Sequence, residues 1–186
     1  MQRVSVVGNS GSGKTTLARA LGRAMEVPHL ELDGIYHQPN WEPLDRDEFR
    51  RRVGEFIAAG RWVIDGNYSA VRDLVWARAD TVVWLDLPRR RVMRQLLWRT
   101  IRRGALRREL WNGNREQLAS LFKADPQESI VRWAWTRHHA YRERYLTASR
   151  DPANAHLTFV RVRSSRDTAA LLRRAQEQAL RGSAGQ

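Results

Sequence analysis

The sequence lacks cysteine altogether, which excludes disulfide bonds, a thiol nucleophile and a cysteine-ligated zinc site. Lysine is scarce too, because only two of the 33 basic residues, Lys14 and Lys123, are not arginine. The longest stretch without a charged residue, 4–13, has ten residues, whereas a membrane-spanning helix needs about 20. We therefore expect no membrane segment.

Acidic residues are also few, 20 against 33 basic ones, which gives a formal net charge of +13. Such an excess predicts an anionic partner, and composition leaves open whether it is a phosphate ester, a nucleic acid or a lipid surface. The length of 186 residues predicts a single domain, 1–186. Because residues 1–4 lead directly into an apolar segment, with no secretory signal pattern, we expect a cytoplasmic protein.

Short apolar segments alternate with segments of helical periodicity along the chain. Asp45 with Glu48 forms a capping-box pattern ahead of one helix, which we expect Gly60 to end. This alternation predicts an α/β three-layer domain, in which helices cover both faces of a five-stranded parallel sheet. The strands are predicted at 4–8, 29–33, 61–66, 81–86 and 157–162, and helices in the intervals include 14–25 and 166–181.

Residues 8–15, Gly-Asn-Ser-Gly-Ser-Gly-Lys-Thr, fit the P-loop pattern G-x-x-x-x-G-K-[ST] between a predicted strand and a predicted helix. Glycines let consecutive backbone N–H groups converge on phosphate oxygens, and the positive end of the helix dipole points to the same place. Lys14 is expected to reach the β- and γ-phosphates and Thr15 to bind Mg²⁺. The residues predicted to hold ATP are Gly8, Asn9, Ser10, Gly11, Ser12, Gly13, Lys14, Thr15 and Thr16.

Arginine is concentrated between residues 88 and 115, where ten arginines accompany one acid, Glu109. Helical periodicity continues through the first part of this segment and is lost over residues 104–125. We therefore predict a lid insertion at about 104–125, long enough to have a function of its own.

Four parts of the sequence together indicate a known family: 8–15, 32–34 with 39–41, 62–68 and 84–89. In these blocks the sequence resembles the adenylate-kinase-related P-loop kinases and, within them, the group labelled DNA topology modulation proteins. No Asn-Lys-x-Asp guanine reader and no Leu-Ser-Gly-Gly-Gln transporter signature is present. The resemblance implies a nucleoside-monophosphate-kinase-like fold and transfer of a phosphoryl group from ATP, and it does not specify the acceptor.

Two acids follow predicted strands at the carboxyl edge of the sheet, where α/β proteins bind ligands. Asp65 is expected beside Thr15, where it would bind Mg²⁺. Asp33 is expected on the acceptor side, as catalytic base, acceptor contact or a further magnesium contact. Trp41 could equally be a core residue. The residues predicted by position to line the acceptor pocket are Asp33, Tyr36, Trp41, Asn67, Tyr68 and Arg72.

The resemblance implies catalytic arginines at two places: on the helix that follows the fourth strand, and beyond the lid. Arg99 matches the helix position by its spacing from Pro88. Arg137 is the candidate on the far side, with Arg132 as the alternative. Together with Lys14 and Asp33, Arg99 and Arg137 form the predicted catalytic set.

Two functions of different classes remain. The first is an ATP- and Mg²⁺-dependent phosphotransferase that acts on an anionic or hydroxyl-bearing small molecule. The second is a nucleic-acid-binding P-loop ATPase that uses the positive charge to hold phosphate backbones, although the sequence has no helix-turn-helix, zinc-finger or RNA-binding aromatic motif. The salt dependence of DNA binding distinguishes the two functions, because an affinity based on many phosphate contacts falls by ~10³–10⁵ between about 50 and 200 mM salt.

Overall fold

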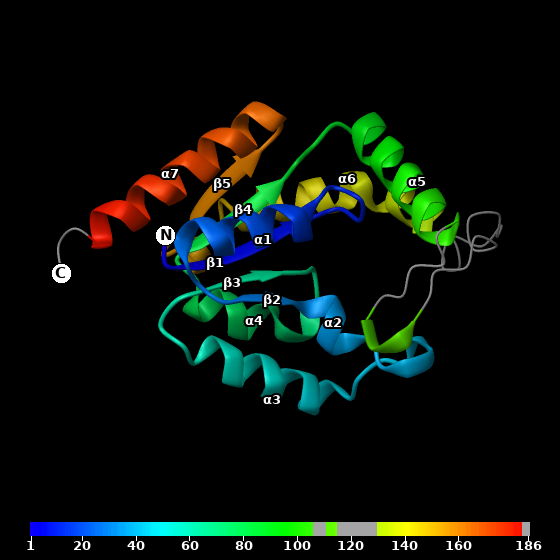
Figure 1. Ribbon diagram of the computed structural model, residues 1–186, viewed down its shortest axis with the longest axis horizontal. Helices are drawn as coiled ribbons and strands as arrows, with labels where there is room; N and C mark the ends of the chain where they lie inside the picture. The colour runs from blue at the N-terminus through cyan, green and yellow to red at the C-terminus, as the bar shows by residue number, and fades with distance from the viewer. Residues whose placement is uncertain (106–110, 115–129, 184–186) are drawn as a thin grey trace.

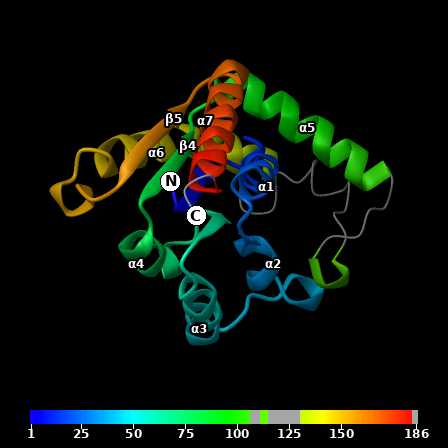
Figure 2. The same cartoon turned by 60° about the vertical axis from the view of Figure 1, so that its left-hand side comes forward.

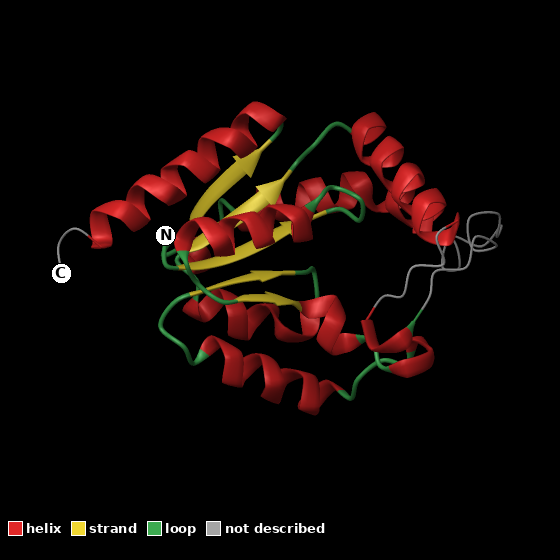
Figure 3. Cartoon of the chain, in the orientation of Figure 1, coloured by secondary structure: helices red, strands yellow, loops and turns green. Residues whose placement is uncertain are grey.

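The computed structural model describes residues 1–105, 111–114 and 130–183. At its centre is a five-stranded sheet in the order β2-β3-β1-β4-β5, with every neighbouring pair parallel. Figure 3 shows these strands enclosed by helices. The predicted α/β class and the number of strands are therefore confirmed. The strands are β1 (Arg3–Gly8), β2 (His29–Glu31), β3 (Trp62–Asp65), β4 (Thr81–Leu85) and β5 (Thr158–Val162).

Helices cover both faces of the sheet and form the outer two of three layers (Figure 1). One apolar cluster joins one face to α1 and α7, with Leu21 and Leu171 among its buried residues. A second cluster joins the other face to α3, α4 and α6, through residues such as Phe49, Val71 and Tyr145. The helices are α1 (Lys14–Met25), α2 (Leu32–Tyr36), η1 (Pro39–Trp41), α3 (Arg46–Ile57), α4 (Ser69–Arg78), α5 (Arg89–Ala105), η2 (Trp111–Gly113), α6 (Ile130–Ala148), η4 (Pro152–Asn154) and α7 (Ser165–Ser183).

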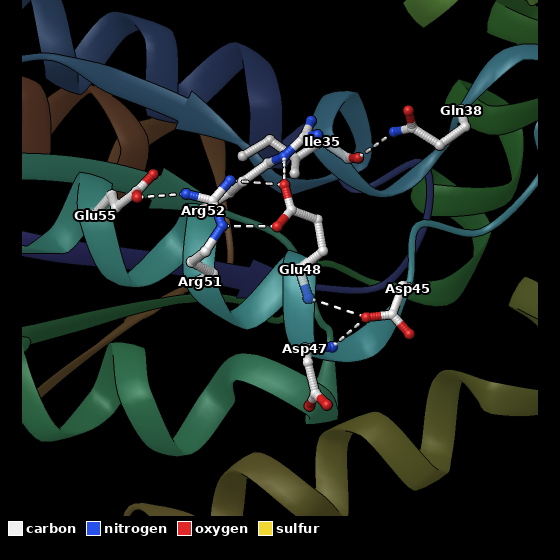
Figure 4. Close-up of polar contacts among 8 residues, drawn as sticks. All are labelled: Ile35, Gln38, Asp45, Asp47, Glu48, Arg51, Arg52 and Glu55. Carbon is white, nitrogen blue, oxygen red and sulfur yellow. Dashed lines mark hydrogen bonds and ion pairs between the residues drawn. The ribbon is translucent and has the colours of Figure 1, made fainter.

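The N-terminus of α3 is capped by Asp45, whose carboxylate accepts the N–H groups of Asp47 and Glu48 (Figure 4). Only this half of the expected capping box forms, because the Glu48 carboxylate binds Arg51 and Arg52 instead. These ion pairs hold the pKa of Glu48 at about 2.

The other end of α3 differs from the prediction. The helix ends at Ile57, and Ala58 is its C-cap. Gly60, which we expected to end the helix, lies two residues farther on. Three apolar residues spaced four apart, Phe49, Val53 and Ile57, are buried along α3, so the helix ends once its last core residue is in place.

Strand β2 is shorter than predicted. It ends at Glu31, and Leu32 begins α2, so Asp33 lies in a helical turn and not in a strand. Leu32 is 3% exposed and packs tightly against Gly66, where an added Cβ would lie 2.8 Å from the Leu32 Cβ. Burial of Leu32 against the loop after β3 therefore turns the chain out of the sheet at this point.

None of the helices within 1–105, 111–114 and 130–183 is long and apolar enough to cross a membrane. The predicted lid, 104–125, lies mostly outside the described residues. Beyond the end of α5, only its residues 111–114 are described.

Candidate active site

The P-loop connects β1 to α1 at the carboxyl edge of the sheet, as predicted. Two of its glycines are required by their surroundings. Gly8 has φ +146°, and an added Cβ would lie 2.8 Å from the Leu85 carbonyl oxygen. Gly11 has φ +78°, and its Cβ would lie 2.7 Å from the Cβ of Leu96 on α5. The loop is thus packed between β4 and α5, with no room for a side chain at Gly8 or at Gly11.

Asn67 holds the start of this loop. Its side-chain oxygen accepts the N–H of Gly8 at 3.2 Å, and its amide nitrogen donates to the Gly8 carbonyl at 2.5 Å. The Tyr145 hydroxyl donates to the same side-chain oxygen at 3.0 Å. Asn67 was predicted for the acceptor pocket, whereas both ends of its amide support the P-loop. Its spacing behind Asp65 gave no sign of this role.

Lys14 is half-buried, and its Nζ donates to the Asn9 carbonyl at 3.1 Å. Burial lowers the pKa of Lys14, although the negative charges of Asp33 and Asp65 act in the opposite direction. The charge of Arg99 on α5 lowers this pKa further. Four of the residues singled out from the sequence are therefore close enough to interact electrostatically.

Thr15 and Asp65 meet as predicted. The Thr15 hydroxyl lies 2.7 Å from Oδ2 of Asp65 and 3.1 Å from Oε1 of Glu31. Asp65 is 3% exposed, and its other oxygen, Oδ1, lies 2.7 Å from Nε2 of His29. Glu31 also forms an ion pair with Arg19 at 2.9 Å.

His29 and Glu31 were not predicted from the sequence. Both lie on β2, and Glu31 is the register partner of Asp65 on the adjacent β3. Parallel pairing of β2 with β3 is the signal that could have identified Glu31, because it places the two carboxyl-edge acids side by side.

On the acceptor side, the Tyr68 hydroxyl donates to Oδ1 of Asp33 at 2.6 Å. Burial, followed by the charge of Asp33, raises the pKa of Tyr68, so the phenol stays protonated. The ring of Tyr36 lies 4.6 Å from that of Tyr68, and both pack against Phe49. The structure thus brings three of the predicted acceptor residues together.

The other two predicted acceptor residues have different surroundings. Trp41 is 39% exposed, which excludes the alternative of a core residue. It adopts a left-handed backbone conformation, with φ +62°. Its N–H donates to the side-chain oxygen of Asn114 at 2.9 Å. Arg72 is exposed on α4, with its guanidinium 5.7 Å from the ring centre of Trp76.

Arg137 is exposed on α6. Burial raises the pKa of Tyr141, the charges of Arg144 and Arg137 lower it, and Asp33 raises it. The charges of Arg137 and Asp33 therefore shift the pKa of the same tyrosine in opposite directions. The side chain of its alternative, Arg132, lies outside the described residues.

Proteins of known structure that resemble this chain along most of its length include three kinases. A shikimate kinase from Bacteroides thetaiotaomicron has a TM-score of 0.58 at 16% identity, covering 95% of this chain and 97% of its own. A gluconokinase from Sinorhizobium meliloti 1021 has a TM-score of 0.51 at 19% identity, covering 97% and 92%. The shikimate kinase from Acinetobacter baumannii, solved in complex with shikimate, has a TM-score of 0.54 at 16% identity, covering 98% and 94%.

The fold is that of shikimate kinase and gluconokinase. These identities are low enough that the likeness concerns the fold alone. No protein-family model and no curated protein matches the sequence. The relationship to P-loop kinases is thus supported at the level of fold, whereas the narrower resemblance to DNA topology modulation proteins gains no support.

Proposed function

We propose that this protein is an ATP-dependent small-molecule kinase that transfers the γ-phosphoryl group of ATP to a hydroxyl group. The observation that carries this proposal is a P-loop between β1 and α1 with two acids beside it: Asp65, whose Oδ2 lies 2.7 Å from the Thr15 hydroxyl, and Asp33, whose charge acts on Lys14. A P-loop lysine binds the phosphoryl group to be transferred. An acceptor hydroxyl at Asp33 would therefore be next to that group.

The P-loop suits a triphosphate in its side chains as well as its backbone. The Ser12 hydroxyl is 2% exposed and, within the described residues, has no hydrogen-bond partner. A buried hydroxyl without a partner is costly, and a phosphate oxygen would satisfy it. Lys14 would exchange its bond with the Asn9 carbonyl for phosphate oxygens, to which a cation binds more strongly.

Thr15, Asp65 and Glu31 fit a magnesium ion. The ion prefers oxygen ligands and commonly keeps several waters while one or two carboxylates and the substrate phosphates hold it. The parts of the chain that the structure describes contain no cluster of three or more acidic, histidine or cysteine side chains that could hold a metal ion by themselves. When bound, Mg²⁺ would neutralise charge on the β- and γ-phosphates.

The transfer step follows from these positions. The acceptor oxygen forms a bond to the γ-phosphorus while the bond to the bridging β–γ oxygen breaks, and ADP leaves. The acceptor hydroxyl loses its proton to the Asp33 carboxylate. Tyr68 fixes the orientation of that carboxylate through its bond to Oδ1. Arg99 would stabilise charge on the transferred group.

The test is phosphorylation of a panel of hydroxyl compounds and nucleotides by ATP labelled at the γ-position, with Lys14→Ala as the matched inactive variant. We expect transfer to at least one small molecule and none by the variant. Binding to a labelled DNA duplex is measured in parallel at low and high salt. DNA binding that collapses with salt, without transfer to any small molecule, would favour the nucleic-acid-binding ATPase over the kinase.

A further inference from the structure

Residues 111–114 lie against the acceptor side of the site, in contact with η1 and α2. In both views of the chain, η2 lies beside η1 and close to α2 (Figures 1 and 2). The side-chain amide of Asn112 donates to the His37 carbonyl at 2.5 Å. Asn114 is 4% exposed, and its side chain donates to the Gln38 carbonyl at 2.8 Å and accepts the Trp41 N–H at 2.9 Å. Two asparagines thus fasten this turn to the backbone that follows α2.

The backbone conformations at the contact support a specific fit. Asn40, Trp41 and Asn112 all have positive φ, between 55° and 62°. Left-handed conformations are unfavourable for residues other than glycine and persist where the surroundings enforce them. Asparagine tolerates this conformation better than most residues, so Trp41 is the strained position, and its N–H is bonded to Asn114 across the contact.

The turn places Trp111 against α2, at the residue that follows Asp33 in the sequence. An added Cβ on Gly34, the residue after Asp33, would lie 2.9 Å from Cδ1 of the Trp111 indole. Only a residue without a side chain allows the ring to lie this close to α2. The indole therefore lies against the backbone of Gly34, one residue after the proposed base Asp33.

Three rings form what we call the aromatic wall: His37, Trp41 and Trp111. The rings of His37 and Trp111 are stacked, with centres 6.1 Å apart and an angle of 26°. Trp41 meets His37 edge-on at 5.3 Å and Trp111 edge-on at 6.4 Å. The wall is linked to Asp33 through Tyr68, whose hydroxyl lies 3.4 Å from Nε2 of His37.

Within the described residues, the rings of this wall contact one another and the neutral side chains of Tyr36 and Tyr68. Burial lowers the pKa of His37, which keeps the imidazole neutral near pH 7. Stacked rings favour contact with the flat face of another ring, and a neutral surface offers no counter-ion to a carboxylate. The chemistry of the wall is thus suited to an uncharged ring.

We propose that Trp111 determines acceptor specificity and that, with His37 and Trp41, it selects an acceptor whose hydroxyl is attached to a neutral ring. This inference rests on the proposed kinase function, which it makes more specific. It distinguishes the protein from enzymes whose acceptors carry a carboxylate. Nucleosides and cyclic sugars share the required chemistry.

The first experiment compares phosphorylation of five compounds by labelled ATP: a nucleoside, glucose, shikimate, gluconate and glycerol. We expect transfer to the nucleoside or to glucose, and whichever is used identifies the kind of ring. Preference for shikimate, gluconate or glycerol would overturn the inference while leaving the kinase function intact. Hydrolysis of ATP with transfer to none of the five would also overturn it.

Variants then test Trp111 itself, with the acceptor that the first experiment identifies. Trp111→Ala should raise the acceptor KM by roughly tenfold and leave the KM for ATP unchanged, whereas Trp111→Phe should retain most of the affinity. Asn114→Ala, which removes the attachment of the turn, should resemble Trp111→Ala. The matched control is Trp135→Ala, because Trp135 is 51% exposed on α6. An unchanged acceptor KM in Trp111→Ala contradicts the proposal.

A second readout does not depend on ATP. The protein is labelled with 5-fluorotryptophan, and the ¹⁹F signal of Trp111 is assigned as the one missing from Trp111→Phe. Titration with the nucleoside and with glucose should shift this signal for at least one of them, with no shift for glycerol and none at Trp135. If neither ring compound moves the Trp111 signal, the wall does not bind the acceptor, whether or not the protein is a kinase.

Discussion

Nε2 of His29 lies 2.7 Å from Oδ1 of Asp65, and this contact joins the second strand to a carboxylate that is only 3% exposed. The other oxygen of Asp65 lies 2.7 Å from the Thr15 hydroxyl. His29 therefore sets the direction in which Asp65 presents its second oxygen to the P-loop. In the proposed kinase, His29 would act on Mg²⁺ only through Asp65, as a positioning residue.

We expect His29→Ala to weaken nucleotide binding mainly when Mg²⁺ is present. Without His29 the Asp65 carboxylate can rotate, and the proposed magnesium site depends directly on its orientation. Loss of the contact should also reduce the free energy of unfolding by ~1–3 kcal/mol, since a buried acceptor loses its partner. His29→Gln, which can still donate to Asp65, should show smaller effects. Calorimetric titration with and without Mg²⁺, together with urea unfolding, measures both. Equal losses of affinity under the two conditions would make the role of His29 purely structural.

Lys14→Ala should reduce phosphoryl transfer by at least ~10²–10³-fold, the usual effect of removing a group that stabilises transition-state charge. The fold should survive, because Lys14 makes its described bond to a loop carbonyl and lies outside the apolar clusters. Circular dichroism checks the fold and initial rates check transfer. A variant with near-native turnover would remove the P-loop lysine from the mechanism.

Asp33→Asn should separate acceptor chemistry from ATP binding. If Asp33 takes the acceptor proton, kcat falls by ~10²–10⁴ while the Kd for ATP changes little. Tyr68→Phe removes the bond to Oδ1 while keeping the ring packed, so its effect on kcat should be smaller. Unchanged kcat and unchanged acceptor KM in Asp33→Asn would exclude both a base and a binding role.

Arg99→Ala should lower kcat by ~10³ or more and reduce ATP affinity far less, because its charge is needed most as the phosphoryl group is transferred. The matched control is Arg94→Ala, an exposed arginine on the same helix. Steady-state rates and nucleotide titration separate the two effects. Similar kinetics for the two variants would show that α5 contributes only general positive charge.

His37 predicts a pH effect on stability. Burial holds its pKa below the ordinary value of 6.5, even though the charge of Asp33 acts to raise it. Protonation therefore favours the unfolded chain, and the stability that neutral His37 allows is lost as the pH falls below about 6.5. In His37→Asn this part of the decline should disappear. Urea unfolding at a series of pH values measures it, with the exposed His139→Asn as control; the same slope in His37→Asn and wild type would contradict the prediction.

The P-loop and the sheet could be predicted from the sequence because both depend on local patterns. The bounds of α1, Lys14–Met25, coincide with the predicted helix. The prediction for 29–33 was wrong by two residues, because contact of Leu32 with Gly66 on another part of the chain ends the strand. A short apolar segment contains no information about such a distant partner.

The candidate site shows the same division. Asp65 beside Thr15 follows from strand order at the sheet edge, and the structure confirms that contact. The roles of His29 and Glu31 depend on which strands are neighbours, and the role of Asn67 depends on the exact position of Gly8. Such side chains are identified by pairing and distance, which a single sequence does not specify.

The two hydrogen bonds between the Asn67 side chain and the Gly8 backbone affect the entropy of nucleotide binding. Both polar groups of the Gly8 backbone are already bonded to Asn67, and Tyr145 braces that amide from α6. The first residue of the P-loop is therefore already ordered before a nucleotide binds. Less conformational entropy is lost on binding than for a loop that folds around its ligand. Tyr145→Phe removes this bond to Asn67 and should therefore make nucleotide binding entropically less favourable.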